Sequence, residues 1–420
     1  MGFAHRLILK NHVLLLIRNA RILTLAIGAR TRHGKELGEL GLIPQGDVLI
    51  TDDKITAVGP KIEAPVEAEV IDAQGRVLMP GFIDCHTHAC WAGDRLNEWE
   101  QKLRGVPYTE ILKTGGGIHA TVQAVRAATK KQLAAHLKSR LDAMLRDGTT
   151  TVEIKSGYGL QTEDELKMLR AIVRAGNEWA GTIVPTALLG HAFEGDLDEY
   201  ARMVVKEMLP AVAKEFPAIT VDAFCETGAW SVEACVRLFE KASKHHTVRV
   251  HADQFNSLGM TPEAIRLNAR SVDHLEASTK NDLLLLAKAR TIGVIMPATG
   301  FQTDGRYAKA GFFVDAGGAV ALASNCNPGT APTHSLPFVI ALAVRFCGLT
   351  PAEAITAATV NAAAVLGLSD RGTIAVGQRA DLILLCYKDE RQLAYELGGN
   401  PVASVICGGR VVGQATAGTA

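Results

Sequence analysis

The chain has 420 residues, of which 48% are apolar and 21% are charged, a composition typical of a folded globular protein rather than a disordered one. Lysine plus arginine and aspartate plus glutamate number 44 each, so the formal net charge is zero. Proteins that bind nucleic acid or an anionic membrane usually carry a basic excess, so this balance argues against both partners. We therefore expect a protein that acts on a small molecule.

The two ends of the chain share short extended segments broken by Gly, Asp and Pro. The first contains LLIRNARILTL and GDVLITDDKITAVG, and the last contains GTIAVGQRADLILL and VASVICGGRVV. Apolar runs between turn residues predict β-strands. We predict that residues 1–79 and 371–420 together form one small β-sandwich domain, which brings the two termini close in space.

Residues 80–370 follow a different pattern, in which short apolar runs alternate with amphipathic stretches such as 131–147 and 162–179. This alternation predicts βα units around a parallel sheet. Eight runs fit strands, which is the number that an α/β fold of the (β/α)₈ TIM-barrel type requires. They are residues 82–88, 149–155, 182–191, 218–226, 248–253, 271–276, 291–297 and 319–325.

The eight cysteines are scattered along the chain and form no CxxC pair. In a chain of this length, that spacing indicates reduced, buried thiols rather than a disulfide framework. The apolar stretch 13–17 is too short to span a bilayer, and no small-residue cleavage site follows it. We expect a cytoplasmic protein with no membrane partner, and a homodimer because two-fold dimers are the commonest oligomers.

Five of the thirteen histidines fall at or near the carboxyl ends of predicted strands, where barrel enzymes place their chemistry. His86 and His88 follow the apolar run PGFID and project to the same side of their strand, and His251 lies within VRVHAD. Imidazoles with one carboxylate suit Zn²⁺ or Fe²⁺, and an aspartate at the end of the eighth strand would be the natural fourth ligand. Packed core histidines are the alternative. The five are His86, His88, His191, His251 and His274.

These segments resemble the metal-dependent amidohydrolase superfamily in MPGFIDCHTH, RVHADQF, SVDHLE and LASNCNPGT. Through EIKSGYGL, TALLGHAF and NPGT the chain looks more narrowly like the imidazolonepropionase family, over essentially its whole length. The resemblance implies a hydrolase of histidine degradation with one Zn²⁺ or Fe ion per chain. Its reaction would open the cyclic amide C–N bond of 4-imidazolone-5-propanoate with activated water, giving N-formimino-L-glutamate.

The resemblance also implies a role for individual residues. It makes His86, His88, His251 and Asn325 the metal-ligand positions, and it makes His274, Asn325 and Gln254 the catalytic positions. The substrate contacts that it implies are Arg95, Tyr158, His191, Gln254, Asn327, Gly329 and Thr330.

The planar guanidinium of Arg95 suits the propionate carboxylate, although without the resemblance Arg95 would be assigned to a helix surface. Tyr158 lies in a Ser-Gly-Tyr-Gly turn that can present a hydroxyl group. Lys155 is expected to be a structural or ion-pair residue, and Glu226 is a further carboxylate near the site whose role stays open.

Position 325 departs from the family pattern, because Asn325 stands where the family has aspartate. An aspartate would ligate the metal and accept a proton from the attacking water, whereas an asparagine carbonyl is a weak ligand and cannot accept that proton. Loss of a general base typically costs about a hundred- to ten-thousand-fold in rate. We predict that the chain keeps the fold and the pocket but turns over slowly.

Two alternatives stay open. An aromatic-ring deaminase of the same superfamily would need a proton-shuttling glutamate where this chain has Gln254, and would have no use for Arg95. A catalytically inactive metal-barrel scaffold is supported by Asn325 but opposed by the intact histidines. Metal content and turnover distinguish these alternatives.

Overall fold

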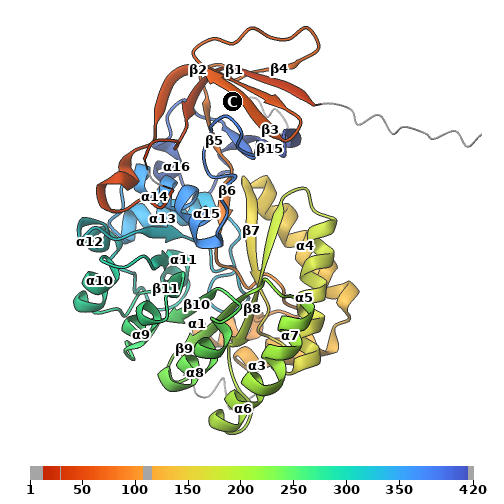
Figure 1. Ribbon diagram of the computed structural model, residues 1–420, viewed down its shortest axis with the longest axis vertical. Helices are drawn as coiled ribbons and strands as arrows, with labels where there is room; N and C mark the ends of the chain where they lie inside the picture. Colours follow the sequence, from red (N-terminus) through yellow and green to blue (C-terminus); the bar gives the residue numbers. More distant parts are fainter. Residues whose placement is uncertain (1–12, 29, 107–115, 415–420) are drawn as a thin grey trace, which may run out of the picture.

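The protein is described by a computed structural model that covers residues 13–28, 30–106 and 116–414. Its centre is an eight-stranded parallel sheet in the order β13-β12-β11-β10-β9-β8-β7-β6 (Figure 1). Each strand lies within one of the eight predicted runs, so the predicted number of strands and the (β/α)₈ barrel are confirmed. The strands are β6 (Phe82–Asp84), β7 (Thr149–Lys155), β8 (Thr182–Gly190), β9 (Thr220–Cys225), β10 (Val248–Ala252), β11 (Ser271–His274), β12 (Ile292–Ile295) and β13 (Val320–Leu322).

The barrel closes just beyond the ends of its first and last strands. Thr87 forms a parallel bridge with Cys326. The backbone N–H of Asn325 donates to the carbonyl of His86 at 3.1 Å, and that of His88 donates to the carbonyl of Cys326 at 2.9 Å. These bonds place the continuation of β6, which carries His86 and His88, beside the continuation of β13, which carries Asn325.

Helices cover the outside of the barrel, as the amphipathic stretches predicted (Figure 1). Every residue of β7 is buried, which is expected of a parallel strand covered on both faces. The helices are α1 (Leu96–Leu103), α3 (Ile118–Ala127), α4 (Lys130–Arg146), α5 (Thr162–Asn177), α6 (Leu197–Met203), α7 (Leu209–Glu215), α8 (Val232–Ala242), α9 (Met260–Arg266), α10 (Lys280–Leu286), α11 (Pro297–Gln302), α12 (Ala310–Asp315), α13 (Leu336–Phe346), α14 (Pro351–Ala357), α15 (Val360–Leu366) and α16 (Gln392–Tyr395).

A second sheet unites the two ends of the chain, as predicted. It runs in the order β16-β15-β14-β5-β1-β2-β3, with β4 paired to β1. All eight strands belong to this one hydrogen-bonded sheet, while the exact domain limits remain a prediction. The strands are β1 (Leu14–Leu23), β2 (Leu42–Thr51), β3 (Lys54–Gly59), β4 (Glu69–Asp72), β5 (Val77–Pro80), β14 (Leu382–Leu385), β15 (Val402–Cys407) and β16 (Arg410–Gln414).

The terminal sheet joins the barrel at the amino ends of the barrel strands. The guanidinium of Arg371 donates to the hydroxyls of Thr151 at 3.0 Å and Thr182 at 2.7 Å, near the starts of β7 and β8. The same guanidinium pairs with Asp381, which precedes β14. The terminal sheet therefore occupies one end of the barrel and leaves the opposite face, at the carboxyl ends of the strands, to the histidines.

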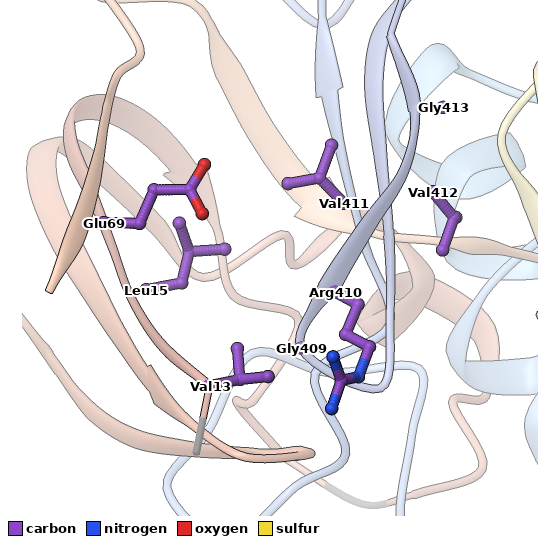
Figure 2. Close-up of a pocket in the computed structure, with 8 residues that line it drawn as sticks. All are labelled: Val13, Leu15, Glu69, Gly409, Arg410, Val411, Val412 and Gly413. Atoms are coloured by element: carbon purple, nitrogen blue, oxygen red, sulfur yellow. The ribbon is translucent and has the colours of Figure 1, made fainter. Parts of the chain in front are cut away.

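A hollow of about 520 Å³ lies in the terminal sheet, between the edge of β1 and β4 and the last strand (Figure 2). Val13, Leu15 and Glu69 line one side of it, and residues 409–413 line the other. None of the predicted site residues lines this hollow.

All eight cysteines are free thiols, and all except Cys386 are buried, as their spacing predicted. Within the described residues, no helix is long and apolar enough to cross a membrane.

Candidate metal centre

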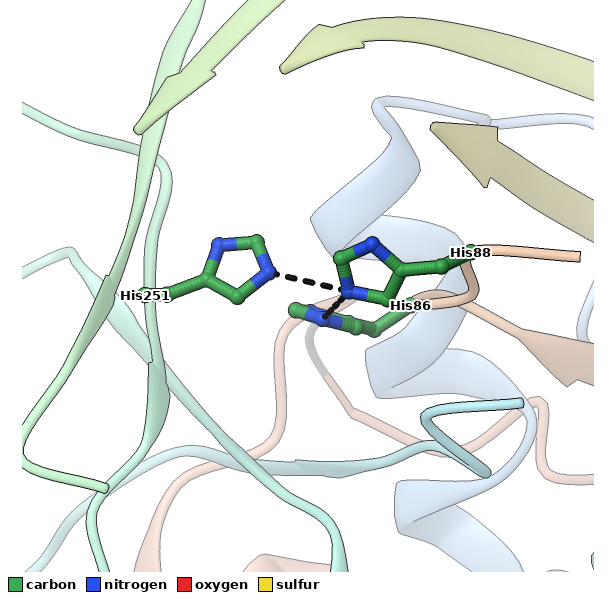
Figure 3. Close-up of side chains that lie close together, drawn as sticks. All are labelled: His86, His88 and His251. Carbon is green, nitrogen blue, oxygen red and sulfur yellow. Dashed lines mark hydrogen bonds between the residues drawn. The ribbon is translucent and has the colours of Figure 1, made fainter. Parts of the chain in front are cut away.

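Three of the predicted metal ligands meet inside the barrel. The Nε2 atom of His88 lies 3.3 Å from Nε2 of His86 and 3.2 Å from Nε2 of His251, and Figure 3 shows the three rings converging. The three side chains are buried, and their ligand atoms lie within 4.8 Å of one another. His86 and His88 come from the continuation of β6 and His251 from β10, so the cluster forms only when the barrel closes.

Two aspartates determine how the outer rings of this cluster are oriented. Nδ1 of His86 lies 2.6 Å from a carboxylate oxygen of Asp273, and Nδ1 of His251 lies 3.1 Å from one of Asp222. A carboxylate only accepts hydrogen bonds, so each histidine carries its hydrogen on Nδ1 and directs an Nε2 lone pair inward. In metal sites, a carboxylate that accepts from the outer N–H of a ligating histidine fixes the orientation and the tautomer of the ring in this way.

The three imidazoles are held in the neutral form that a metal requires. Burial lowers the pKa of His86 and His88 well below the usual histidine value, and it also lowers the pKa of His251. A neutral His88 has one proton to share and cannot satisfy both inward lone pairs. Since Nδ1 of His88 also has no hydrogen-bond partner, the donor set fits a cation better than it fits a packed core.

Beneath the histidines lies a network of buried charges, of which only Lys155 was predicted from the sequence. The five side chains are at most 1% exposed, and they alternate with other residues along β7, β9, β10 and β11. Charged residues inside otherwise apolar strands are the sequence signal that could have revealed them, because such strands bury both faces. They are Glu153, Lys155, Asp222, Arg249 and Asp273.

The network is a continuous series of ion pairs that begins at Asp222, the partner of His251, and ends at Asp273, the partner of His86. Lys155 lies 2.7 Å from both Asp222 and Glu153, which confirms the expected ion-pair role of Lys155. Arg249 connects Glu153 to Asp273. Burial raises the pKa of Asp222, but His251 and Lys155 outweigh it and hold that pKa well below the usual value. Asp222 is therefore an ionised carboxylate that accepts the hydrogen bond from Nδ1 of His251.

Replacing Lys155 with methionine should destabilise the fold by about 3–5 kcal/mol, because Asp222 and Glu153 would be left as buried carboxylates without their shared cation. Chemical denaturation of Lys155→Met and the parent chain measures the difference. Lys131→Met, at an exposed position of α4, is the matched control and should change stability by less than about 0.5 kcal/mol. Equal unfolding free energies for Lys155→Met and the parent would contradict this account.

Asn325 is buried beside the cluster, with a backbone φ of 55°. Its side-chain nitrogen donates to the hydroxyl of Thr299 at 2.9 Å. Its side-chain oxygen is buried without a hydrogen-bond partner in the described structure. The Asn325 backbone N–H donates to the His86 carbonyl, and the side-chain amide keeps an unused acceptor, which is compatible with a weak oxygen ligand.

His274 ends β11 close to the cluster. Its ring centre lies 5.7 Å from that of His251 and 5.9 Å from that of His86. Its Nδ1 lies 3.3 Å from the carboxylate of Glu276. A φ of 99° at His274 is a strained conformation for a residue with a side chain, and such strain is concentrated at functional sites.

Gln254 follows β10 in a loop that Glu226 organises. The carboxylate of Glu226 accepts hydrogen bonds from the backbone N–H groups of Phe255 at 2.8 Å and Asn256 at 3.1 Å. Glu226 thus holds the loop that carries Gln254, and the amide of Gln254 makes no hydrogen bond within the described residues. The structure gives Glu226 a supporting position rather than direct contact with the histidine cluster.

Tyr158 and His191 lie on the side of the cluster nearest His88. The ring of His191 stacks on that of His88 with centres 4.9 Å apart, and the ring of Tyr158 lies 5.1 Å from His191. Burial raises the pKa of Tyr158, so its hydroxyl keeps its proton. Burial lowers the pKa of His191 to about 3. Both groups are therefore neutral hydrogen-bonding residues.

Arg95 precedes α1 and reaches the loop at residues 327–330. Its Nε pairs with the buried carboxylate of Glu98, which also pairs with Lys102 at 2.7 Å. Two cations and one carboxylate leave one net positive charge. A side chain added at Gly329 would meet Nη1 of Arg95 at 3.3 Å, so the guanidinium lies directly beside this glycine.

The loop at residues 327–330 is built around the side chain of Asn327. Its oxygen accepts from the N–H groups of Gly329 and Thr330, both at 2.8 Å, and its nitrogen donates to the carbonyl of Asn325 at 2.6 Å. The structure thus uses the Asn327 amide to shape the loop. It brings Gly329 to Arg95 and places this loop next to Asn325.

Comparisons with known proteins agree with this arrangement. A model of the Amidohydrolase family matches residues 77–412. An imidazolonepropionase of Herpetosiphon aurantiacus is 44% identical over 396 residues, covering 90% of this chain and 93% of the relative. An imidazolonepropionase of Deinococcus radiodurans is 44% identical over 379 residues, covering 90% and 94%. A third, from Symbiobacterium thermophilum, is 40% identical over 414 residues, covering 95% and 97%.

Solved structures with lower identity share the fold. A crystal structure of an amidohydrolase is 17% identical with a TM-score of 0.68, covering 96% of this chain and 100% of that chain. A triazine hydrolase variant is also 17% identical with a TM-score of 0.68, covering 95% and 94%. These likenesses concern the barrel with its terminal sheet.

Proposed function

Because this chain belongs to the amidohydrolase family and, within it, to the imidazolonepropionases, we propose that it hydrolyses the ring C–N amide bond of 4-imidazolone-5-propanoate to give N-formimino-L-glutamate. The observation that carries the proposal is the cluster of three neutral imidazoles with their Nε2 atoms turned inward. The one net positive charge around Arg95 adds a site for the propionate group, which the reaction leaves unchanged.

His86, His88 and His251 would hold one Zn²⁺ or Fe ion per chain, with the Asn325 oxygen as a weak fourth ligand. Such an ion, when bound, lowers the pKa of a water molecule and polarises a carbonyl group. Imidazole and oxygen ligands suit both metals.

The residues of the chain would position the substrate around that centre. Arg95 would bind the propionate carboxylate through the guanidinium N–H groups that Glu98 does not use. Tyr158 would donate a hydrogen bond to the imidazolone ring, and His191, whose Nδ1–H is used by the Gly157 carbonyl, would accept one on Nε2. Gln254 would bind the ring without transferring a proton. His274, whose Nδ1 lies next to the Glu276 carboxylate, would orient the attacking water by accepting a hydrogen bond from it on Nε2.

Turnover of metal-quantified protein tests the proposal directly. Loss of the ultraviolet absorbance of 4-imidazolone-5-propanoate, with formation of N-formimino-L-glutamate, is the expected result. The aromatic-ring deaminase is disfavoured by Gln254, since an amide cannot shuttle protons. Metal bound without turnover by this chain or by Asn325→Asp would contradict the proposed substrate and lead to a panel of deaminase substrates. Absence of both metal and turnover would favour a scaffold.

Replacing Arg95 with leucine should raise KM for the imidazolone by about 30-fold or more, since a charged hydrogen bond to a carboxylate is worth at least about 2 kcal/mol. Glu98 keeps Lys102 as a partner, so the helix should remain folded. Arg95→Lys keeps the charge but loses the planar fork and should give an intermediate KM. Arg104→Leu, at an exposed position after the same helix, is the control. An unchanged KM for Arg95→Leu would contradict the assignment.

A cytoplasmic homodimer remains our prediction for the assembly and location. Light scattering of the purified chain and fractionation of cells that express it measure these two properties.

A further inference from the structure

The loop between β7 and α5, which carries Tyr158, is folded around one buried carboxylate. Glu165 lies in the first turn of α5 and is 1% exposed. One of its oxygens accepts from the backbone N–H of Gly157 at 2.8 Å. The other accepts from the N–H groups of Gly159 at 2.6 Å and Leu160 at 2.9 Å. Three backbone N–H donors of the loop therefore depend on a single side chain.

The backbone of the loop approaches the start of α5 so closely that few other loop conformations fit. A side chain added at Gly159 would lie 2.5 Å from the backbone nitrogen of Glu165, so only glycine allows this approach. Gly157 has a φ of 109° and Leu160 a φ of 56°, both in the left-handed region. The hydroxyl of Tyr200 donates to the carbonyl of Leu160 at 2.9 Å and supports the far end of the loop. Glu165 and the glycines together determine one loop conformation.

Position 165 requires a carboxylate, because both side-chain oxygens of Glu165 accept hydrogen bonds from backbone N–H groups of the loop. Glutamine at this position would accept on one side only, and its NH₂ group would face an N–H donor on the other. Within the described residues no cation pairs with Glu165, so its charge is balanced mainly by the backbone donors of the loop. Its side chain has no ion-pair role that would otherwise explain a buried glutamate.

The loop connects Glu165 to two of the residues proposed to contact substrate. Tyr158 lies between the bonded residues Gly157 and Gly159. The carbonyl of Gly157 accepts a hydrogen bond from Nδ1 of His191 at 3.0 Å, so the same loop orients the His191 ring. A displacement of the loop would move the hydroxyl of Tyr158 and release His191 from its stack on His88.

We propose that Glu165 is a positioning residue for substrate binding, because its carboxylate holds the 157–160 loop so that Tyr158 and His191 face the substrate. The proposal rests on the function proposed above. Glu165 acts through the loop and does not touch the reacting atoms.

The test compares Glu165→Gln with the parent chain, both loaded with zinc. We expect KM for 4-imidazolone-5-propanoate to rise by at least about tenfold while kcat changes by less than about threefold, because the contacts involved bind substrate and transition state alike. Hydrogen exchange of the amides at residues 157–160 should become at least about tenfold faster. Zinc content should stay the same.

Two variants control the experiment. Glu163→Gln removes a carboxylate from the same turn of α5 at a side chain that is 83% exposed, and should leave KM and exchange unchanged. Glu165→Asp keeps the charge with a shorter reach, and should give intermediate values that remain measurable if the glutamine variant does not fold.

Unchanged exchange in Glu165→Gln, or faster exchange with unchanged KM, would overturn the proposal. So would a fall in kcat with an unchanged KM, because it would place Glu165 in the chemical step. If the parent chain does not turn over the imidazolone, the proposed function fails, and the exchange rates still decide whether Glu165 holds the loop.

Discussion

Asn325→Asp should raise turnover of 4-imidazolone-5-propanoate by about a hundred- to ten-thousand-fold, which is the usual contribution of a general base. An aspartate adds the proton acceptor that an amide cannot provide. The site can accommodate it, because the Thr299 hydroxyl that now accepts from the Asn325 nitrogen can rotate and donate to a carboxylate. The side-chain oxygen of Asn325 is already buried without a hydrogen-bond partner, and the backbone of Asn325 bonds to that of His86.

Charge balance supports the same expectation. The three carboxylates and two cations of the buried network leave one net negative charge beneath the histidines, and an aspartate at 325 would make it two, equal in size to the charge of a divalent ion. Asn325→Asp should therefore also tighten metal binding, which titration with a competing chelator measures. Asn281→Asp, at an exposed position of α10, is the matched control. Equal turnover by the parent and Asn325→Asp would contradict the assigned role of position 325.

His88→Ala should abolish metal binding, with less than about a tenth of an ion per chain, and reduce turnover by at least about a thousandfold. His88 is the central member of the cluster, with its Nε2 close to the other two. Metal analysis of the purified variant is the first measurement. A second is thermal unfolding with added zinc, since an ion at a hundred times its Kd stabilises the parent by about 2.7 kcal/mol and should not stabilise the variant.

His136→Ala, at an exposed position of α4, controls for the loss of an imidazole and should bind metal like the parent. A full metal content and unchanged turnover in His88→Ala would mean that the three histidines are packed core residues. That result would contradict the metal centre while leaving the fold unaffected.

The barrel and most of the candidate site could be predicted from the sequence because their signals are local. Strand and helix patterns repeat within short windows, and each of the eight strands lies inside its predicted run. His86 and His88 are two residues apart in one motif, so their meeting required no knowledge of distant parts of the chain. The family resemblance could also be recognised from short motifs, and the similar imidazolonepropionases confirm it.

The supporting residues could not be predicted, because their partners are distant in the chain. Asp273 meets His86 across 187 residues and Asp222 meets His251 across 29, and no local pattern specifies those pairs. Arg95 and Gly329 likewise meet only when the first and last barrel strands come together.

The sequence by itself therefore determined the barrel, the identity of the imidazoles and the departure at Asn325, since each depends on residue type and short-range spacing. The tertiary structure alone decided which nitrogen of each imidazole faces inward and which loop conformation presents Tyr158. Both depend on buried carboxylates such as Asp222 and Glu165, whose charge is stable only where folding supplies enough donors and cations.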